Sequence, residues 1–478
     1  MRLAPLAFAL LTACDPATVD VLPDPTDTNV TDTDTDTDTD TDADSDADGD
    51  TDADADADQP VNLTDLSWRL HEVVDAMVYA SWAQDAPANV HVEYSFDDGV
   101  WASTPSFDAL AGPQEQLVVG IPYATDAAWR VVADSGDAVD GPTITTGDFP
   151  SGLRQGELLV WDEAATRPGY NYLMTTINQT AGGWTGGNYW TFIMDRQARV
   201  VWAHLAPDRH WSLYATVAVT RDHILWDEST YWSDYDDGAA SKIHRRYLDE
   251  EIEVLDTPGL HHEFVQLPDG TLVWGSQDDG GGEALVEMAP GETERTIIWT
   301  CNDDWSGSGR CESNGLFYDE PTNTYLYSFY TNNSIVEVDR ATGHSNWWAG
   351  DVRDGYTFDP PESQYSWQHG VSWTDSGTLL VSSTEDRDDT RLLEYEVDRT
   401  DGVLRNVWEN GSGVYASTNG DAWRYENGNT LHMVGAAGVA REVGADGEDV
   451  WRVDFNNDYL LGRGELIQDL YTLVKPRE

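Results

Sequence analysis

The chain has little positive charge. Its 478 residues carry 26 Lys and Arg against 88 Asp and Glu, which gives a formal net charge of −62 at pH 7. A surface of this sign repels the phosphates of nucleic acids and the anionic headgroups of membranes. Nucleic acid is therefore not expected as a partner, and the charge favours solubility in a salty or crowded exterior.

Long apolar runs are also scarce. Residues 3–11 form an apolar stretch that follows Arg2 and is too short to cross a bilayer. A short positive start followed by such a run is typical of a secretory signal. No later stretch is long and apolar enough for a transmembrane helix. We expect residues 1–13 to be removed as a signal peptide.

The apolar run ends in Leu11-Thr12-Ala13-Cys14. This phrase resembles the bacterial lipobox, in which small residues precede an obligatory Cys, and the resemblance implies that Cys14 is lipidated. Several acyl chains make a stable membrane anchor. An ordinary signal peptide with an incidental Cys is the alternative. We expect an exported lipoprotein, held by its lipid at a periplasmic face or a cell surface.

Cysteine is rare, with three residues in all. With Cys14 used for lipid, Cys301 and Cys311 remain as a pair close in sequence. An exported chain meets an oxidising compartment, so we expect these two residues to form a disulfide. A redox or metal role has less support, because there is no CxxC spacing and no nearby His.

Positive charge is missing altogether from residues 24–58, where sixteen Asp alternate with Thr and Ala. Such a segment has nothing to bury and repels itself, so residues 14–59 are expected to form an extended, disordered stalk. Asp44 begins a phrase like that of a calcium-binding loop, but loop position 12 is Ala55 rather than the required Glu. No specific metal site and no cofactor is expected.

About 420 residues remain after the stalk, which is too many for a single domain with one hydrophobic core. In residues 60–150, the runs Val90-His91-Val92-Glu93-Tyr94 and Trp129-Arg130-Val131-Val132-Ala133 alternate apolar and polar side chains between Gly and Pro turn signals. This spacing predicts a small β-sandwich that resembles a fibronectin type III domain. Nothing in this unit is typical of a catalytic site, so its expected role is to position the next domain.

Residues 151–478 contain an internal repeat. An apolar strand, an Asp or Gly turn and a strand ending in Trp recur at steps of 43 to 61 residues, with one copy that reaches Val254 instead of Trp. The five Trp positions are Trp202, Trp299, Trp347, Trp408 and Trp451. Tight hairpin phrases such as Leu267-Pro268-Asp269-Gly270 recur between the copies. Six copies of this size predict a six-bladed β-propeller. We expect the Trp residues to pack between blades, with sugar stacking by a few of them as the alternative.

Histidines occupy equivalent positions in two copies of the repeat. His261 and His262 precede the hairpin phrase at residues 267–270, and Gln368 and His369 precede Asp375-Ser376-Gly377. The innermost strand of every propeller blade faces one shared axis, so both phrases are expected to point there. A single His is more often structural. Two His residues at the same position of a repeat make a functional role as well supported as a structural one.

At this point the chain resembles a family, the bacterial aryl-sulfate sulfotransferases. Its His-Asp-Phe and Leu-Pro-Asn-Gly-Asn phrases look like His262-Glu263-Phe264 and Leu267-Pro268-Asp269-Gly270-Thr271. Its Phe-Ser-x-Gln-His looks like Tyr365-Ser366-Trp367-Gln368-His369, and its Ser-Arg-x-x-Glu-Tyr like Thr390-Arg391-Leu392-Leu393-Glu394-Tyr395. Its Asn-Gly-Asn-Thr-Leu looks like residues 427–431, and its C-terminal Tyr-Arg-Ala-Glu-Arg is similar to Gly462-Arg463-Gly464-Glu465-Leu466. The family's His-x-Asn-Ser stands here as Glu312-Ser313-Asn314-Gly315, without the His.

The resemblance implies sulfuryl transfer from an aryl sulfate to a phenol through a sulfohistidine, without a nucleotide donor. A neutral imidazole can act as the nucleophile, and cationic donors are needed around the sulfate oxygens. The implied catalytic residues are His262, His369 and Arg391, and the implied substrate-binding residues are His261, Gln368 and Asn314. Which His would carry the sulfuryl group stays open.

Two other functions stay open. In the first, the chain has kept the propeller but lost the chemistry, and it acts as a surface binding or adhesion module. A hydrolase or lyase on the same fold has less support, because no carboxylate cluster or metal-ligand set recurs near the expected axis.

Overall fold

A computed structural model describes residues 60–97, 99–179, 188–206, 210–230, 241–277, 283–305, 311–385, 388–456 and 459–477. Cys14 and the Asp-rich residues 24–58 lie outside the described residues, so the predicted lipid anchor and stalk remain predictions. Within the described ranges, no helix is long and apolar enough to cross a membrane.

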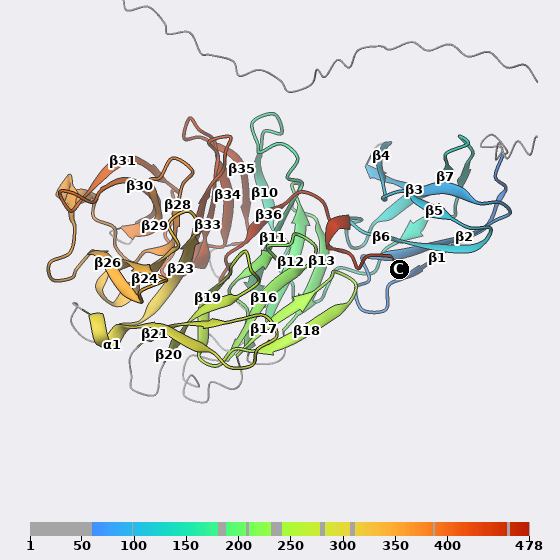
Figure 1. The fold of residues 1–478 in the computed structure, drawn as a ribbon. Helices are drawn as coiled ribbons and strands as arrows, with labels where there is room; N and C mark the ends of the chain where they lie inside the picture. The colour runs from blue at the N-terminus through green and yellow to red at the C-terminus, as the bar shows by residue number, and fades with distance from the viewer. Residues whose placement is uncertain are drawn as a thin grey trace, which may run out of the picture. The chain divides into compact units, whose positions relative to one another are not determined.

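The fold is all-β and propeller-like, as the sequence predicts for its class (Figure 1). The one α-helix in the described part of the chain is the single turn α1 (Cys301–Asp304). The short 3-10 turns are η2 (Tyr330–Asn332), η3 (Pro361–Ser363), η4 (Gly435–Ala437) and η5 (Tyr471–Leu473).

Residues 63–145 form two sheets. The smaller sheet has the order β1-β2-β6, from β1 (Leu63–Leu70), β2 (Val78–Gln84) and β6 (Gly112–Val118). The larger sheet runs β4-β3-β7-β8, with β5 against β3 and β9 against β7. Its strands are β3 (Ala88–Asp97), β4 (Val100–Ser103), β5 (Phe107–Ala109), β7 (Asp126–Ala133), β8 (Ala138–Asp140) and β9 (Ile144–Thr145).

The two alternating runs of the sequence lie in β3 and β7, which pair antiparallel with Val90 opposite Ala133. Val92, Tyr94 and Val131 are buried along with their apolar neighbours, while the residues between them are more exposed. Successive strand side chains point to opposite faces, so one face of this sheet forms the core of the unit. The prediction of these two strands is confirmed.

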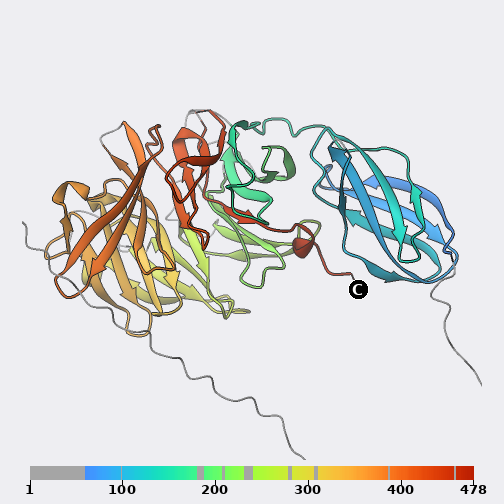
Figure 2. The ribbon, with the colours of Figure 1, turned by 90° about the horizontal axis from the view of Figure 1, so that it is seen from above.

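Residues 157–467 form six further sheets, each built mainly of antiparallel strands (Figures 1 and 2). The first two are β36-β11-β12-β13 and β18-β17-β16-β14, with β15 also against β16. Their strands are β11 (Tyr172–Asn178), β12 (Tyr189–Asp195), β13 (Val200–Leu205), β36 (Glu465–Ile467), β14 (His210–Trp211), β15 (Ala215–Val217), β16 (Ile224–Thr230), β17 (Lys242–Arg246) and β18 (Glu251–Asp256).

The third and fourth sheets are β19-β20-β21-β22 and β23-β24-β25-β26. Their strands are β19 (Leu260–Gln266), β20 (Leu272–Gln277), β21 (Glu283–Met288), β22 (Thr296–Thr300), β23 (Ser313–Asp319), β24 (Thr324–Phe329), β25 (Ser334–Asp339) and β26 (His344–Ala349). The last two are β28-β29-β30-β31-β27 and β32-β33-β34-β35-β10. Their strands are β27 (Thr357–Asp359), β28 (His369–Trp373), β29 (Leu379–Glu385), β30 (Asp389–Asp398), β31 (Val403–Gly411), β32 (Asp421–Arg424), β33 (Thr430–Val434), β34 (Val439–Val443), β35 (Asp449–Asp454) and β10 (Glu157–Trp161).

The sequence repeat corresponds to these sheets. Every copy ends on the same kind of strand, because Trp202, Trp299, Trp347, Trp408, Trp451 and the odd Val254 lie on β13, β22, β26, β31, β35 and β18. Four of the five indoles are buried and Trp408 is half-buried, so packing is the confirmed role of those four. The hairpin phrases connect the first and second strands, and Gly270, Gly377 and Gly428 supply the positive φ that these turns need.

The first strands β19, β23, β28 and β32 lie against one another in that order, and β36 lies against β15. The second and third sheets meet through β16 and β19. The two ends of this region close it. The C-terminal strand β36 pairs with β11 in the first sheet, and β10 pairs with β35 in the last. Segments that are distant in sequence are therefore brought to one centre.

Candidate functional site around the first strands

The histidine phrases fall where the first strands are irregular. The register shifts between Leu260 and Phe264 in β19, and again between His369 and Val371 in β28. A bulge adds a residue to one strand and re-aims the side chains beside it. The backbone of His262 has φ +63°, which is rare for a residue with a side chain. The predicted equivalence of the two phrases is therefore visible in the backbone.

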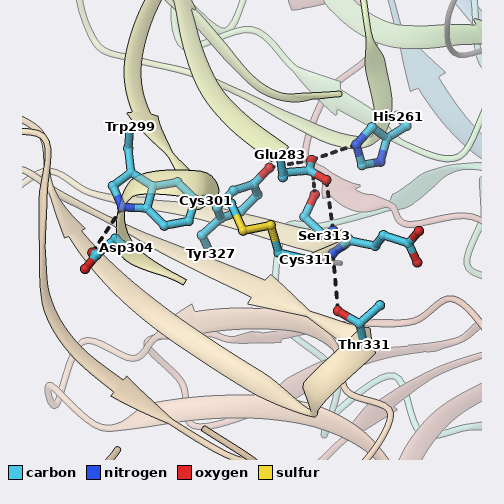
Figure 3. Close-up of a disulfide and its surroundings, with 10 residues drawn as sticks. His261, Glu283, Trp299, Cys301, Asp304, Cys311, Ser313, Tyr327 and Thr331 are labelled. Atoms are coloured by element: carbon cyan, nitrogen blue, oxygen red, sulfur yellow. Dashed lines mark hydrogen bonds and ion pairs between the residues drawn. A yellow bond between two sulfur atoms is a disulfide. The ribbon is translucent and has the colours of Figure 1, made fainter. Parts of the chain in front are cut away.

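His261, His262 and Glu283 form a hydrogen-bonded chain. The Nδ1 atoms of the two histidines lie 2.7 Å apart, and His261 Nε2 lies 2.7 Å from Glu283 Oε1. Glu283 is the first residue of β21, and Figure 3 shows its carboxylate facing His261. All three side chains are buried, with 3%, 6% and 1% exposure. A carboxylate and two imidazoles are therefore joined by successive hydrogen bonds.

Glu283 is held ionised at the end of this chain. Burial alone would raise its pKa, but His261 and hydrogen bonds from Tyr327 and Ser313 hold the pKa below its ordinary value. Tyr327 and the Ser313 hydroxyl each donate to Oε1 at 2.7 Å. An ionised carboxylate only accepts, so His261 Nε2 must donate to it.

The hydrogen bond from His261 to Glu283 limits where His261 and His262 can carry their protons. With His261 neutral, its Nδ1 carries a lone pair and accepts from His262 Nδ1, so the lone pair of His262 lies on Nε2. With His261 protonated beside the carboxylate, its Nδ1–H donates to His262 Nδ1, and His262 carries its proton on Nε2. Burial lowers the pKa of His262 well below its ordinary value, and His261, Arg463 and His369 lower it further. His262 is therefore an unprotonated imidazole whose orientation is set by a carboxylate two groups away.

The predicted disulfide between Cys301 and Cys311 is confirmed, with their Cα atoms 6.5 Å apart. Both residues are buried, and Tyr327 shares their apolar cluster. Ser313 follows Cys311 by two residues, and its backbone N–H also donates to Glu283 (Figure 3). The disulfide thus fixes the segment that presents Ser313 to Glu283.

His369 has a different set of partners. Its Nδ1 donates to the main-chain carbonyl of Trp367 at 2.9 Å, and the side chain is 6% exposed. Burial lowers its pKa to about 4, although that hydrogen bond works in the opposite direction. Gly370, the next residue, has φ +74°, and a Cβ there would lie 2.6 Å from the Cα of Asp421. Only glycine fits at that position.

The side-chain amides of Asn314 and Gln368, which were predicted to bind substrate, are buried. They form hydrogen bonds with Ser328 and with main-chain carbonyls. Asn314 donates to the main-chain carbonyl of Gln368 at 2.7 Å and accepts from Ser328. Gln368 Nε2 lies 3.0 Å from three acceptors, namely Ser328 Oγ and the carbonyls of Phe329 and Ser334. Its Oε1 has no hydrogen-bond partner among the described residues. These amides mainly tie β23, β24 and β28 together.

Arg391 is not brought to the histidines. It lies on β30, which is separated from β28 by β29, so its strand is roughly 10 Å from that of His369. Its guanidinium faces Asp389 and Glu409, at 3.4 and 3.8 Å. Arg391 therefore shares a sheet with His369 but lies two strands away from it, beside carboxylates.

Arg463 supplies the central cation and was missing from the predicted site. It is fully buried and forms an ion pair with Glu263. It also donates to the main-chain carbonyls of Asn314 and of Gly420, the latter at 3.1 Å. Burial lowers its pKa to about 10, so it stays protonated at neutral pH. A cation inside Gly462-Arg463-Gly464, just before the last strand, was the signal available in the sequence.

Comparisons with known proteins give similarity in fold only. No protein-family model and no curated protein matches the sequence. A solved structure of a protein of unknown function from Bacteroides caccae is similar at 12% identity, with 59% of this chain and 93% of that chain covered and a TM-score of 0.41. An auxiliary nutrient binding protein from Bacteroides ovatus is similar at 11% identity over 83% and 86%, with a TM-score of 0.37. Regucalcin, a calcium-binding protein from Agrobacterium tumefaciens, is similar at 14% identity over 51% and 73%, with a TM-score of 0.35.

Proposed function

We propose that residues 151–478 are a six-bladed β-propeller, preceded by a fibronectin type III-like sandwich in residues 60–150. Support comes from the six sheets, from the contacts between successive sheets near their first strands, and from the pairing of β36 with β11 and of β10 with β35. Each blade then contributes its first strand to the centre, where the histidine chain and Arg463 lie.

The propeller is proposed to be an exported lipoprotein anchored at Cys14, with residues 14–59 as its stalk. The support is the lipobox-like phrase and the Asp-rich composition. In cells that export the full chain, a Cys14→Ser variant should move from the membrane fraction to the soluble fraction. An unchanged membrane fraction would reject the anchor.

The proposed activity is sulfuryl transfer from an aryl sulfate to a phenol. The observation that carries it is the chain Glu283–His261–His262, in which a neutral His261 places the lone pair of His262 on Nε2, the proposed nucleophile. In the first step Nε2 forms a bond to sulfur, the bond from sulfur to the aryl oxygen breaks, and the phenolate leaves. In the second step an acceptor phenol oxygen attacks sulfur, the N–S bond breaks, and the phenolic proton is lost to solvent.

The histidine chain would stabilise the charge that develops on His262. Sulfation at Nε2 makes this ring cationic, so its Nδ1–H is drawn towards His261, and His261 is drawn in turn towards the Glu283 carboxylate. This is the role of the buried carboxylate in a catalytic triad, with one more imidazole between. The nearby Arg463 charge, which already lowers the pKa of His262, would attract the sulfate.

A direct test uses the exported chain with 4-nitrophenyl sulfate and phenol. Nitrophenolate release that depends on phenol, and a sulfuryl group on the His261–His262 peptide in mass spectrometry, are the expected results. No release under any acceptor would reject the activity.

A non-catalytic binding module is the second candidate. It is favoured by one observation, that Arg391 is paired with Asp389 and Glu409 instead of facing the histidines. In that case His262 and His369 would be buried structural groups. Binding of an aryl sulfate without any turnover would support this candidate over the first.

A further inference from the structure

An exposed indole stands beside the second histidine. Trp367 is 51% exposed, the highest fraction for any aromatic side chain in the described ranges. It precedes Gln368, which is fully buried, and its carbonyl accepts the hydrogen bond from His369 Nδ1. The chain thus passes from the surface to the buried site within two residues.

The backbone of Trp367 is held in an unfavourable conformation. Its φ is +47°, in the left-handed region that a large side chain seldom adopts. Its N–H donates to Asn333 Oδ1 at 2.9 Å, and Asn333 Nδ2 donates in turn to Asp351. Strain of this kind persists only where the surroundings enforce it, and it is concentrated at functional sites.

The residues on both sides of Trp367 are fixed as well. The Tyr365 hydroxyl donates to the Ala349 carbonyl at 2.9 Å, and Ser366 exchanges hydrogen bonds with Ser383. Gln368 is tied by the three bonds of its Nε2. The neighbours of Trp367 in residues 365–369 are therefore buried or held by hydrogen bonds. The Trp367 indole is the one large side chain of these five residues that faces solvent.

A second ring supports the indole. Tyr330 stacks on Trp367 with ring centroids 6.3 Å apart and an angle of 21° between planes. Its hydroxyl donates to Glu312 at 2.5 Å, which fixes the phenol ring. Isolated exposed hydrophobic residues are ordinary on protein surfaces. A strained indole that stacks on a fixed ring, two residues before a buried histidine, is a rigid aromatic platform.

We infer that Trp367, supported by Tyr330, is a subsite that stacks the aromatic ring of a small aryl ligand beside His369. This deepens the proposed function, on which its biological role rests, because it assigns the preference for aryl groups to one side chain. Aromatic rings stack with offset or edge contacts that a saturated ring of the same size lacks.

The test measures binding without any sulfuryl group. Isothermal titration compares 2-naphthol with its saturated analogue decahydro-2-naphthol on the full chain. We expect 2-naphthol to bind at least tenfold more tightly, Trp367→Ala to remove that difference, and Trp367→Phe to keep most of it. Trp101→Ala is the matched control, because Trp101 is also exposed but lies on β4 in the sandwich.

The outcomes separate this inference from the proposed activity. Binding of 2-naphthol that depends on Trp367 supports the platform even when 4-nitrophenyl sulfate is not turned over. Equal binding of the two alcohols, or unchanged binding in a folded Trp367→Ala protein, overturns it. Circular dichroism and the thermal midpoint establish that each variant is folded.

Discussion

His262 and His369 occupy the same place in two sheets and have different chemical surroundings. His262 is joined through His261 to the ionised Glu283, whereas His369 donates to a main-chain carbonyl and has no carboxylate partner among the described residues. Both imidazoles are buried and unprotonated at neutral pH. A neutral amide dipole fixes a tautomer, but only a charged partner also stabilises a positive ring. The repeat position therefore sets where a histidine lies, and its neighbours set what it can do.

The largest expected difference is in turnover. His262→Ala should abolish phenol-dependent nitrophenolate release, about 10⁴-fold or more, because the nucleophile is lost. His369→Gln should lower it about tenfold, since Gln can still donate to the Trp367 carbonyl. Steady-state rates with 4-nitrophenyl sulfate measure both. Equal losses in the two variants would remove the distinction between the histidines.

The second-largest effect is expected from removing the charge of the Glu283 carboxylate. Glu283→Gln should lower kcat by roughly 10³-fold with little change in KM, because the charge that stabilises a cationic His262 is lost. Glu287→Gln is the control on the same strand, where Glu287 binds Arg340 and Tyr325 instead. A rate within threefold of wild type in Glu283→Gln would show that the histidine chain is only structural.

The third effect concerns stability and pH. His369 has a pKa of about 4 when folded and about 6.5 when unfolded, so between these values the unfolded chain binds the extra proton. The free energy of unfolding therefore falls as the pH drops from about 6.5 to 4, by about 3 kcal/mol from this group alone. His369→Gln should reduce this loss in urea titrations at pH 4.5 and 7. An identical loss in both proteins would contradict the buried neutral imidazole.

The smallest effect is expected at Arg391. Its ion pairs with Asp389 and Glu409 lie two strands from His369, and the side chain is 36% exposed. Arg391→Gln should change turnover less than threefold and stability by less than about 1 kcal/mol. A large loss of kcat would instead show that Arg391 reaches the reacting group during turnover.

Much of the fold could be predicted from the sequence because local patterns encode it. The alternation in β3 and β7, the hairpin glycines and the recurring Trp all depend on neighbours within a few residues. The disulfide of Cys301 and Cys311 was predictable for the same reason, since the two residues are close along the chain. The site was predicted in part: His261 and His262 were named together, but their carboxylate was not.

The missing parts come from distant segments. Glu283 lies in the next hairpin, and Arg463 reaches Glu263 from the far end of the chain, 200 residues away. Neither contact has a local signal, because only the closure by β36 brings the C-terminal segment to the centre. Arg391 lies on β30, two strands from β28, and a sequence motif gives no position of a strand within its sheet.

The sequence by itself determined the strand pattern, the recurrence of strand-turn-strand units, the position of the histidine phrases and the acidic charge. These properties follow from side-chain periodicity and turn chemistry, which act over short distances. Only the tertiary structure decided which charges face which imidazole, because burial and sheet order assign Glu283 to His261, a carbonyl to His369 and Arg463 to the centre. The protonation of each histidine, and with it the proposed chemistry, is set at that level.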